Sequence, residues 1–247
     1  MRRSLTALPI FNEADHVNQV LDEVARYCDQ ILVVDDGSTD GTASLLARRS
    51  DVRVITHPSN RGYGAALQSA FQYAIDHEFH VLVTIDCDGQ HEPQRIRQFV
   101  KATATADIVS GSRYLHSFSE DTVAPAERRW VNQCITAKLN ARLGLRLTDA
   151  FCGFKAYRVA ALKQLHIHED GYAMPLELWV QAVANHLHVI EIPVPLIYLE
   201  EERSFGGSLD NARIRLQYYH EVLERSVAGG WNSRRRGSRS VARVQDE

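Results

Sequence analysis

Strand-sized apolar runs alternate with amphipathic segments along the first 113 residues of the chain. The apolar runs lie at residues 5–8, 31–34, 52–55, 81–85 and 108–110. Segments with helical periodicity lie between them, at residues 17–27, 43–48 and 65–75, and from about residue 93 onward. Alternation of this kind predicts right-handed crossovers and a mainly parallel sheet with helices on both faces. We therefore predict the α/β fold class.

The rest of the chain is patterned less regularly. Residues 114–125 are polar and aperiodic, which predicts a mobile surface loop. The elements expected after it are a helix at residues 126–143, a short strand near Phe154, a helix at residues 175–186, an edge strand at Pro193 and Pro195, and a helix from about Leu209 with one apolar face. Residues 228–247 are rich in arginine, serine and glycine, and we expect a basic, disordered tail there, outside a single domain of residues 1–227.

Composition and charge exclude several classes of function. The 247 residues carry a net charge of -3, so no global positive field exists to hold a nucleic acid, and we expect no nucleic-acid partner. The four cysteines are widely separated and lack the CxxC spacing of zinc or redox sites, which fits a reducing compartment. No stretch approaches 18 consecutive apolar residues. A cytoplasmic protein is therefore expected, with peripheral contact at most on the inner face of the membrane.

Four polar clusters follow directly after apolar runs. They lie at residues 9–13, 35–40, 86–90 and 111–113. In an open parallel sheet, ligands bind at the carboxyl ends of the strands. The four clusters are therefore expected to converge on one edge of the sheet and to form a single site.

Asp86, Asp88 and Gln90 place two carboxylates and an amide oxygen on alternate residues just after a predicted strand. Alternate side chains of an extended segment point the same way. Oxygen ligands suit Mg²⁺ or Mn²⁺, which takes one or two protein carboxylates beside phosphate oxygens and water. An Asp-x-Asp pair alone is more often a simple turn, because aspartate favours turns. The neighbouring clusters favour a metal site here, with Mg²⁺ or Mn²⁺ as the expected cofactor.

A second acidic turn, at residues 35–41, follows another predicted strand. Its carboxylates cannot bind phosphate without a metal, but they can accept hydrogen bonds from a ribose or a base. Asn60, Gly62 and Gly64 open the next helix. Their spacing differs from that of a GxGxxG phosphate loop, so we expect close backbone packing or shaping of a donor loop there.

Five segments together resemble glycosyltransferase family 2, nearest its dolichyl-phosphate mannosyltransferase-like branch. They are PIFNE at residues 9–13, VVDDGSTDGT at 33–42, NRGYG at 60–64, DCDGQH at 86–91 and GSRY at 111–114. The resemblance extends from about residue 4 to 210 and implies a GT-A, Rossmann-like fold. It also implies inverting, metal-dependent transfer of a hexose from a GDP- or UDP-sugar to a polyprenyl or dolichyl phosphate. The nucleotide-binding half would end near residue 113, and the acceptor-side half would span residues 114–227.

The resemblance also assigns roles at the donor site. The nucleoside is expected against Pro9, Phe11, Glu13, Val34 and Asp36. The diphosphate is expected beside Asp86, Cys87, Asp88, Arg113 and Arg203, with the metal on Asp86, Asp88 and Gln90 and with Asp88 counted as catalytic. Phe11 stands where this branch often has tyrosine, so a stacking face is retained and a hydroxyl is lost. A lysine is expected six residues after Arg203, but Leu209 stands there, so the diphosphate is clamped more weakly or Arg213 takes part.

An acceptor phosphate needs cations more than it needs a base, because its second pKa is about 6 and its oxygen is already ionised at neutral pH. Arg113, Arg128 and Arg129 flank the polar loop, and guanidinium groups suit phosphate oxygens. In the resembling enzymes, an arginine with a serine four residues later binds this phosphate. Here Arg128 is followed by Asn132, whose amide can still donate. A solvated helix start is the simpler explanation of Arg128 and Arg129, although arginines there oppose the helix dipole.

Other readings of the sequence remain open. A family 2 transferase acting on a glycan or protein hydroxyl would need a general base, and Asp149 and Glu177 are the catalytic candidates for it. We expect His91 to support the metal turn as an outer partner. A nucleotidyltransferase would need a basic, glycine-rich loop where residues 11–13 read FNE. A non-catalytic nucleotide-sugar binding module would not need the set Asp86, Asp88, Gln90 and Arg203.

Overall fold

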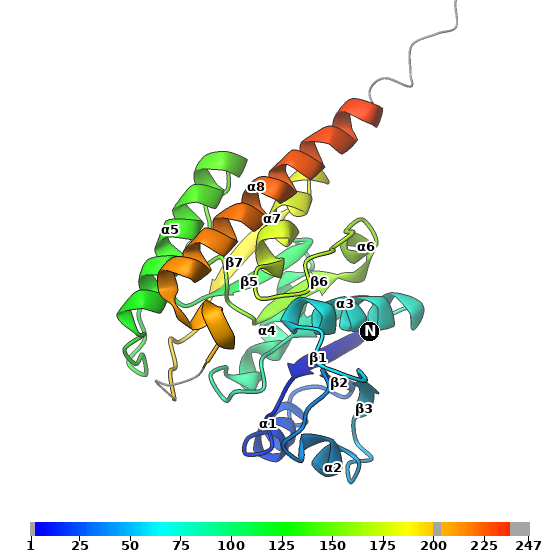
Figure 1. The fold of residues 1–247 in the computed structure, drawn as a ribbon. Coiled ribbons are helices and arrows are strands. Elements are labelled where there is room, and N and C mark those ends of the chain that lie inside the picture. The colour runs from blue at the N-terminus through cyan, green and yellow to red at the C-terminus, as the bar shows by residue number, and fades with distance from the viewer. Residues whose placement is uncertain (1–2, 200–203, 238–247) are drawn as a thin grey trace, which may run out of the picture.

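The computed structural model describes residues 3–199 and 204–237, with side chains described through residue 229. Its centre is a seven-stranded sheet in the order β3-β2-β1-β4-β6-β5-β7 (Figure 1). The strands are β1 Ser4–Ile10, β2 Ile31–Asp35, β3 Arg53–Thr56, β4 Val81–Thr84, β5 Ile108–Ser112, β6 Lys155–Arg158 and β7 Val189–Pro193. Every strand pair is parallel except the two that involve β6. The predicted α/β fold with a mainly parallel sheet is confirmed.

Helices cover both faces of this sheet (Figure 1). They are α1 Val17–Val24, α2 Thr42–Leu46, α3 Tyr63–Asp76, α4 Ile96–Ala102, α5 Ala126–Leu143, α6 Val159–Leu162, α7 Met174–Ala184 and α8 Ala212–Gly237. Because side chains alternate along a strand, β1 sends Leu5 and Ala7 into one apolar core, with α3, α5, α7 and α8. It sends Leu8 and Ile10 into a second core, with α1, α2 and α4. Burial on both faces explains the nearly continuous apolar runs.

β6 comes late in the chain but lies inside the sheet, between two earlier strands. It lies antiparallel between β4 and β5, with Thr84 opposite Lys155 and Ser110 opposite the same lysine. The short strand expected near Phe154 is therefore present, but its antiparallel insertion between two strands of the first half was not predicted. β7 occupies the edge of the sheet beside β5, as the prolines at residues 193 and 195 indicated.

The C-terminal helix differs from the prediction at its start. Residues 207–210 form a short 3-10 turn, and α8 begins at Ala212. The helix packs against α7 and α5, and Lys138 of α5 pairs with Glu224 of α8 at 3.1 Å. α8 continues to Gly237, so the domain boundary expected at residue 227 falls inside a helix, and residues 238–247 lie outside the described residues. Over residues 3–199 and 204–237, no helix is both long and apolar enough to cross a bilayer.

Candidate active site

A cavity of about 810 Å³ lies at the carboxyl ends of β1, β2, β4 and β5. It is closed on the other side by residues from α5, α7, α8 and the segment before α8. All four polar clusters that follow the strands contribute to its lining. The convergence expected from the parallel sheet is therefore observed, and the cavity is the candidate active site.

The first wall of the cavity is built by the segment after β1, which is tied to the turn after β2. The Asn12 backbone amide donates to Ser38 Oγ at 2.9 Å, and Thr39 N donates to Asn12 Oδ1 at 2.8 Å. Glu13 N donates to Thr42 Oγ1 at 3.0 Å. These bonds hold Phe11 at the cavity with 42% of its surface exposed, so its ring is available for stacking. Pro9 and Glu13 also line the cavity.

Asp36 lines the cavity, but its carboxylate also organises the protein itself. Its two oxygens accept hydrogen bonds from Arg61 N at 3.0 Å and Gly62 N at 2.7 Å, and His57 Nδ1 lies 2.6 Å from Oδ1. Asp36 therefore fixes the loop that opens α3. Val34, predicted at the same site, is fully buried among core residues and contributes no surface to the cavity. Any effect of Val34 on a nucleoside is indirect.

The loop before α3 is closely packed, as expected from its glycines. A Cβ atom at Gly62 would lie 2.4 Å from Asp170 O, and one at Gly64 would lie 2.2 Å from Glu169 O. Gly62 also has a φ of 108°, which L side chains rarely adopt. This packing brings the 169–172 segment against the start of α3. It explains why Tyr63 and Tyr172 stack at a centroid distance of 5.8 Å inside the cavity wall.

The turn after β4 places Asp86, Asp88 and Gln90 on the cavity surface. Tyr63 OH donates to Asp86 Oδ1 at 3.1 Å, and Gln90 N donates to Asp88 Oδ1 at 3.0 Å. Asp86 fits because residue 153 is glycine: a Cβ there would lie 2.0 Å from Asp86 Oδ2. The predicted acidic turn is thus an open surface whose carboxylates face a cavity.

His91 supports this turn from behind. Its side chain is 5% exposed, and its Nε2 lies 3.2 Å from Asp86 Oδ2. This is the outer-partner position expected from the sequence. Its Nδ1 is buried and has no hydrogen-bond partner among the described residues. Cys87, between the two aspartates, is buried and presents little beyond its backbone to the cavity.

The donor set at this turn fits a divalent cation of limited protein coordination. Within the described part of the chain, no three His, Cys, Asp or Glu side chains come together as a complete metal site. Mg²⁺ and Mn²⁺ bound with a nucleotide use one or two carboxylates and take their other ligands from phosphate oxygens and water. Asp86 and Asp88, with the Gln90 amide beside them, have the chemistry and the exposure for that arrangement.

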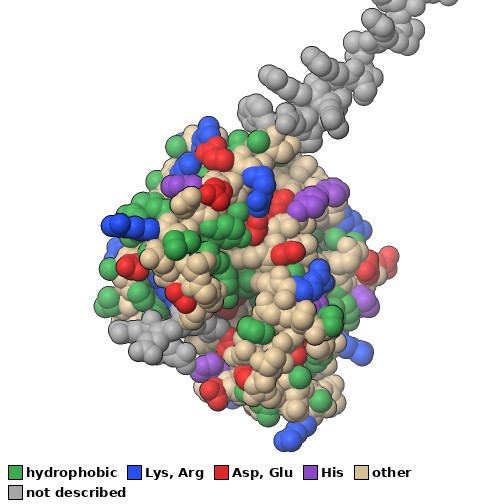
Figure 2. Space-filling model, viewed as in Figure 1, with side chains coloured by type: hydrophobic (Ala, Val, Ile, Leu, Met, Phe, Trp, Pro, Cys, Tyr) green, Lys and Arg blue, Asp and Glu red, His purple; other side chains and the backbone are tan. Residues whose placement is uncertain are grey.

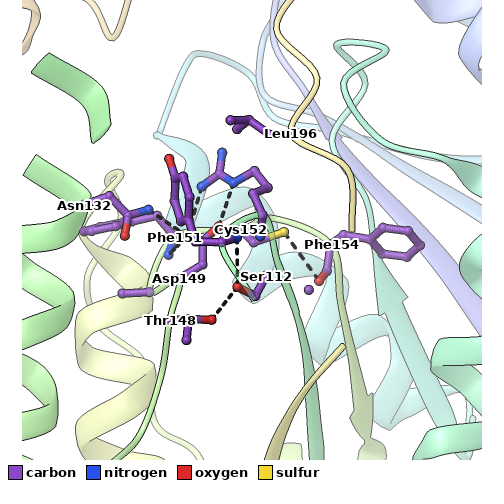
Figure 3. A network of polar contacts seen from close by, with 12 residues as sticks. Ser112, Asn132, Thr148, Asp149, Phe151, Cys152, Phe154 and Leu196 are labelled. Carbon is purple, nitrogen blue, oxygen red and sulfur yellow. Dashed lines mark hydrogen bonds and ion pairs between the residues drawn. The ribbon is translucent and has the colours of Figure 1, made fainter. Parts of the chain in front are cut away.

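Asp149 is the centre of a buried polar network beside the cavity (Figure 3). Arg113 forms a two-point ion pair with it, with Nε at 2.6 Å from Oδ2 and Nη2 at 3.0 Å from Oδ1. Asn132 Nδ2 donates to Oδ1 at 2.7 Å, and Phe151 N donates to the same oxygen at 3.1 Å. Asp149 is fully buried and has no surface on the cavity.

The electrostatics of this network keep Asp149 ionised and make its carboxylate a weak proton acceptor. Burial alone would raise the pKa of Asp149, but the Arg113 charge and the hydrogen bonds from Arg113 and Asn132 hold it well below its usual range. Burial alone would lower the pKa of Arg113, and the Asp149 carboxylate more than offsets this, so the guanidinium stays charged. Asp149, which the sequence offers as a base for a hydroxyl acceptor, is here an ion-paired carboxylate inside the protein and not part of the cavity lining. Its role is to position Arg113 and Asn132 at the cavity wall.

Glu177 is the second base candidate that the structure removes from the site. It lies in the first turn of α7 and has no surface on the cavity. Its Oε2 accepts hydrogen bonds from His168 N at 2.9 Å and Glu169 N at 2.8 Å. Gln181 Nε2 donates to Oε1 at 3.1 Å. Glu177 therefore holds the 168–169 loop and lies outside the cavity lining.

Of the residues predicted to bind the acceptor, Arg128 and Asn132 line the cavity, and Arg129 does not. Arg128 lines the cavity, with its guanidinium carbon 4.6 Å from the centroid of the Phe205 ring. Asn132 also reaches the cavity, but its amide is committed to Asp149 and to Thr136, whose hydroxyl donates to Asn132 Oδ1 at 2.9 Å. Arg129 points toward Tyr114, 5.9 Å from the ring centroid, and does not line the cavity. Arg203 lies outside the described residues.

Several cavity residues were not singled out as site residues from the sequence. Among them are Tyr63, Tyr172, Phe205 and Arg215. Tyr63 belongs to the NRGYG segment at residues 60–64, so its place beside the glycines was a usable signal. Arg215 had no signal of this kind. The helical periodicity alone does not tell whether Arg213 or Arg215 points into the molecule.

Comparison with known proteins agrees with this geometry. Residues 6–166 match the sequence family described as "Glycosyl transferase family 2". Polyprenol monophosphomannose synthase of Mycolicibacterium smegmatis is 32% identical, over 92% of this chain and 88% of that protein. Undecaprenyl-phosphate mannosyltransferase of Micrococcus luteus is 28% identical, over 87% of this chain and 92% of that protein.

Solved structures show the same fold at lower identity. Glucosyl-3-phosphoglycerate synthase from Mycobacterium tuberculosis, crystallised with UDP, superimposes with a TM-score of 0.70 at 20% identity. The match covers 92% of this chain and 80% of that one. The same enzyme, crystallised with Mn²⁺, UDP and glucosyl-3-phosphoglycerate, superimposes with a TM-score of 0.68. The fold is GT-A, and the chain belongs to glycosyltransferase family 2.

Proposed function

We propose that this protein transfers a hexose, with inversion, from a nucleotide-sugar to the phosphate of a polyprenyl phosphate. One observation carries the choice of acceptor: neither of the two carboxylates that the sequence offers as a base for a hydroxyl acceptor lines the cavity. Asp149 is buried in an ion pair, and Glu177 is bound to a loop outside the cavity. A phosphate monoester needs no such base, because its oxygen is ionised at neutral pH. The acceptors named for the two mannosyltransferase relatives are of this class.

The donor is proposed to lie across the carboxyl ends of β1, β2 and β4. Phe11 supplies a ring face for the base, and the loop ordered by Asp36 shapes the pocket for the nucleoside. The diphosphate then falls beside Asp86 and Asp88, where carboxylates alone would repel it. A divalent cation held by Asp86, Asp88 and Gln90 would neutralise the charge that develops on the leaving diphosphate.

The reaction needs no covalent intermediate on the protein. An ionised oxygen of the acceptor phosphate attacks the anomeric carbon as the bond from that carbon to the diphosphate breaks. The nucleoside diphosphate leaves with the electron pair of the broken bond, so direct displacement gives inversion. Arg128 is placed to hold the acceptor phosphate opposite the diphosphate, and alignment of this kind supplies much of the rate enhancement in transfer reactions.

Exposed apolar side chains support a position at the membrane surface. Leu115 and Leu199 directly follow the cavity residues Tyr114 and Tyr198, and they are 44% and 61% exposed. Val123 is 89% exposed, and its neighbour Thr122 bonds to Leu196 O at 2.7 Å, so the two apolar segments adjoin. Hydrophobic side chains gather on the α5 side of this face of the molecule (Figure 2). An isoprenoid chain leaving the cavity here would meet an apolar surface.

The membrane position can be tested apart from catalysis. The Val123→Asp variant should float less with anionic phospholipid vesicles than the unaltered protein does. Its turnover of a short, water-soluble acceptor should be unchanged, because Val123 does not line the cavity. If the two proteins float equally well, the apolar surface around Val123 does not bind the membrane.

The transfer itself is tested with the purified full chain, Mn²⁺ or Mg²⁺, a panel of GDP- and UDP-sugars, and farnesyl phosphate as a short polyprenyl phosphate. Farnesol is the matched control, because it differs only in lacking the phosphate. Metal-dependent product on farnesyl phosphate and none on farnesol is the expected result. Donor binding or slow donor hydrolysis without lipid product would overturn the polyprenyl phosphate acceptor and leave a transferase of another acceptor class.

A further inference from the structure

Arg215 on α8 is a buried cation that faces the cavity. Its side chain is 3% exposed, and it belongs to the cavity lining. Its Nη1 donates to Leu209 O at 2.6 Å and to Asp210 O at 3.3 Å, which fixes the guanidinium beside the turn before the helix. Its guanidinium carbon lies 4.3 Å from the centroid of the Phe205 ring. The group is therefore held in one place before any ligand arrives.

Phe205 holds a second guanidinium as well. Arg128 stacks on the same ring at 4.6 Å, so two cationic side chains from α5 and α8 share one aromatic contact at the cavity. Like charges at this spacing repel each other, and the repulsion is stronger in a partly desolvated site than in water. Burial lowers the pKa of Arg215, and Arg128 adds to that effect. An anion bound beside Arg215 would offset the cost of burying its charge.

The contrast with Arg113 shows what Arg215 lacks. Arg113 is neutralised by the buried Asp149 carboxylate. Across residues 3–199 and 204–229, Arg215 forms hydrogen bonds to backbone carbonyl oxygens and no ion pair with a carboxylate. Asp210, which is close along the chain, directs its carboxylate to Ser204 Oγ and to Phe205 N, each at 2.6 Å. The positive charge of Arg215 can therefore interact with an anion bound in the cavity.

We infer that Arg215 binds a phosphate group of a substrate in this cavity. The inference rests on the proposed function, because that function places two phosphate-bearing substrates here: the donor diphosphate and the acceptor phosphate monoester. Guanidinium groups bind both through charge-assisted hydrogen bonds to oxygen. Arg215 touches the carbonyl of Leu209, the residue that stands where a lysine was expected, and so it brings a cation to that position from the next helix.

Arg213 does not meet these conditions, although the sequence suggested it for this role. It is exposed and does not line the cavity. Two residues along an α-helix are about 200° apart around the axis, so Arg213 and Arg215 point in opposite directions. Arg213 is therefore a matched control, with the same side chain on the same turn but outside the site.

The alternative role for Arg215 is purely structural, as a donor to the carbonyl oxygens of residues 209 and 210. Arg215→Gln keeps an amide donor and removes the charge, while Arg215→Lys keeps the charge and changes the shape. Arg213→Gln is the control. For each protein, the measurements are the thermal midpoint, the Kd of UDP and GDP with Mn²⁺ in the absence of acceptor, and the KM of farnesyl phosphate with the preferred donor.

Loss of a charge-assisted bond to phosphate should weaken binding about tenfold to a hundredfold. We expect this loss in Arg215→Gln, partial recovery in Arg215→Lys, and no change in Arg213→Gln. A higher Kd for the nucleoside diphosphate would assign Arg215 to the donor, and a higher KM for farnesyl phosphate alone would assign it to the acceptor. A Kd and KM that both match those of the unaltered protein would overturn the inference, and a lower thermal midpoint would then leave only the structural role.

The design also separates this inference from the proposed function. Nucleoside diphosphate binding needs no acceptor, so it reports on Arg215 even if the unaltered protein fails to use farnesyl phosphate. If Arg215→Gln does not fold, Arg215→Lys and the double variant Leu209→Lys, Arg215→Lys still give a result. Because Leu209 lines the cavity, a lysine there should tighten nucleoside diphosphate binding if phosphate lies beside this turn. Two results together would count against a phosphate at this position. They are a double variant that binds the nucleoside diphosphate no more tightly than Arg215→Lys does, and an Arg215→Lys variant whose Kd equals that of the unaltered protein.

Discussion

Two aspartates beside the same cavity have opposite surroundings. Asp149 is fully buried and receives hydrogen bonds from Arg113, Asn132 and the backbone of residue 151. Asp86 is half-buried and lines the cavity, and its contacts include the Tyr63 hydroxyl and His91. The sequence offers both as active-site residues. In the structure, Asp149 lies inside the protein and binds other parts of the fold, whereas Asp86 lines the cavity.

The difference lies in where the compensating charge comes from. A buried carboxylate is stable only when the protein supplies partners for it, and Arg113 does so for Asp149. At the turn after β4, Asp86 and Asp88 both line the cavity, and oxygen ligands of this kind suit a divalent cation. The Asp149 carboxylate has its charge balanced inside the protein, whereas these two carboxylates have surface on the cavity.

The largest expected effect is a loss of turnover, without a loss of stability, when Asp88 in the turn after β4 is replaced. Asp88→Ala should lower metal-dependent transfer by about a thousandfold, because a cation on the leaving group supplies several kcal/mol of stabilisation. Its thermal midpoint should match that of the unaltered protein. Turnover with Mn²⁺ and thermal unfolding are the two measurements. Glu120→Ala, which changes an exposed acid in the 114–125 loop, is the control and should change neither. Retained turnover in Asp88→Ala would remove Asp88 from the metal site.

The opposite result is expected at Asp149. Asp149→Ala leaves the Arg113 charge buried without its partner, which should lower the free energy of unfolding by about 3–5 kcal/mol. Urea denaturation measures the change. The matched control is Asp51→Ala, which breaks the ion pair between Arg49 and Asp51 at the surface and should cost at most about 1 kcal/mol. Similar values for the two variants would show that burial does not distinguish the pairs.

A smaller change moves Asp86 without altering its chemistry. Gly153→Ala places a methyl group 2.0 Å from the present position of Asp86 Oδ2, so the carboxylate must shift. Displacement of a positioning group by about 1 Å can cost about a hundredfold in rate, and a fall in kcat/KM of up to this size is expected. Gly229→Ala is the control, because a Cβ there meets nothing within 4 Å. Unchanged kcat/KM in Gly153→Ala would mean that the turn tolerates the shift.

The smallest effect concerns acid stability. The pKa of Asp149 in the folded protein lies well below its value of about 3.9 in an unfolded chain. Its contribution to stability is therefore fully present above about pH 4 and is lost as the pH falls toward the folded-state pKa. Between pH 5 and pH 3, the unaltered protein should lose about 1 kcal/mol more stability than Asp149→Asn does. Parallel curves from urea denaturation at a series of pH values would contradict this.

The sequence predicted the position of the site because a general rule governs it. Parallel strands end on one edge, so polar residues after β1, β2, β4 and β5 had to meet there, and the lining of the cavity includes all four clusters. The open acidic turn and the supporting role of His91 also followed from local spacing. The glycine-rich start of α3 was correctly expected to pack closely against other backbone.

The sequence could not show which charged side chains the fold would neutralise. Asp149 and Glu177 were equal candidates for a base, and only the positions of Arg113 and of the loop at residues 168–169 remove them. Val34 belongs to a donor motif but is buried in the core, because helices cover both faces of the strand in which it lies. Arg213 and Arg215 are two residues apart, and their difference depends on the rotation of α8 about its axis.

The antiparallel insertion of β6 has a consequence for the synthesis of the chain. β4 is complete at Thr84, but its free edge is covered only when β6, at Lys155–Arg158, has been made. Until then, a nascent chain presents an uncovered apolar strand, the kind of edge that pairs with other chains. Contacts between residues so far apart in sequence also form slowly. A chain that ended before β6 would keep this edge of β4 uncovered, and we expect such a fragment to aggregate more readily than the full chain.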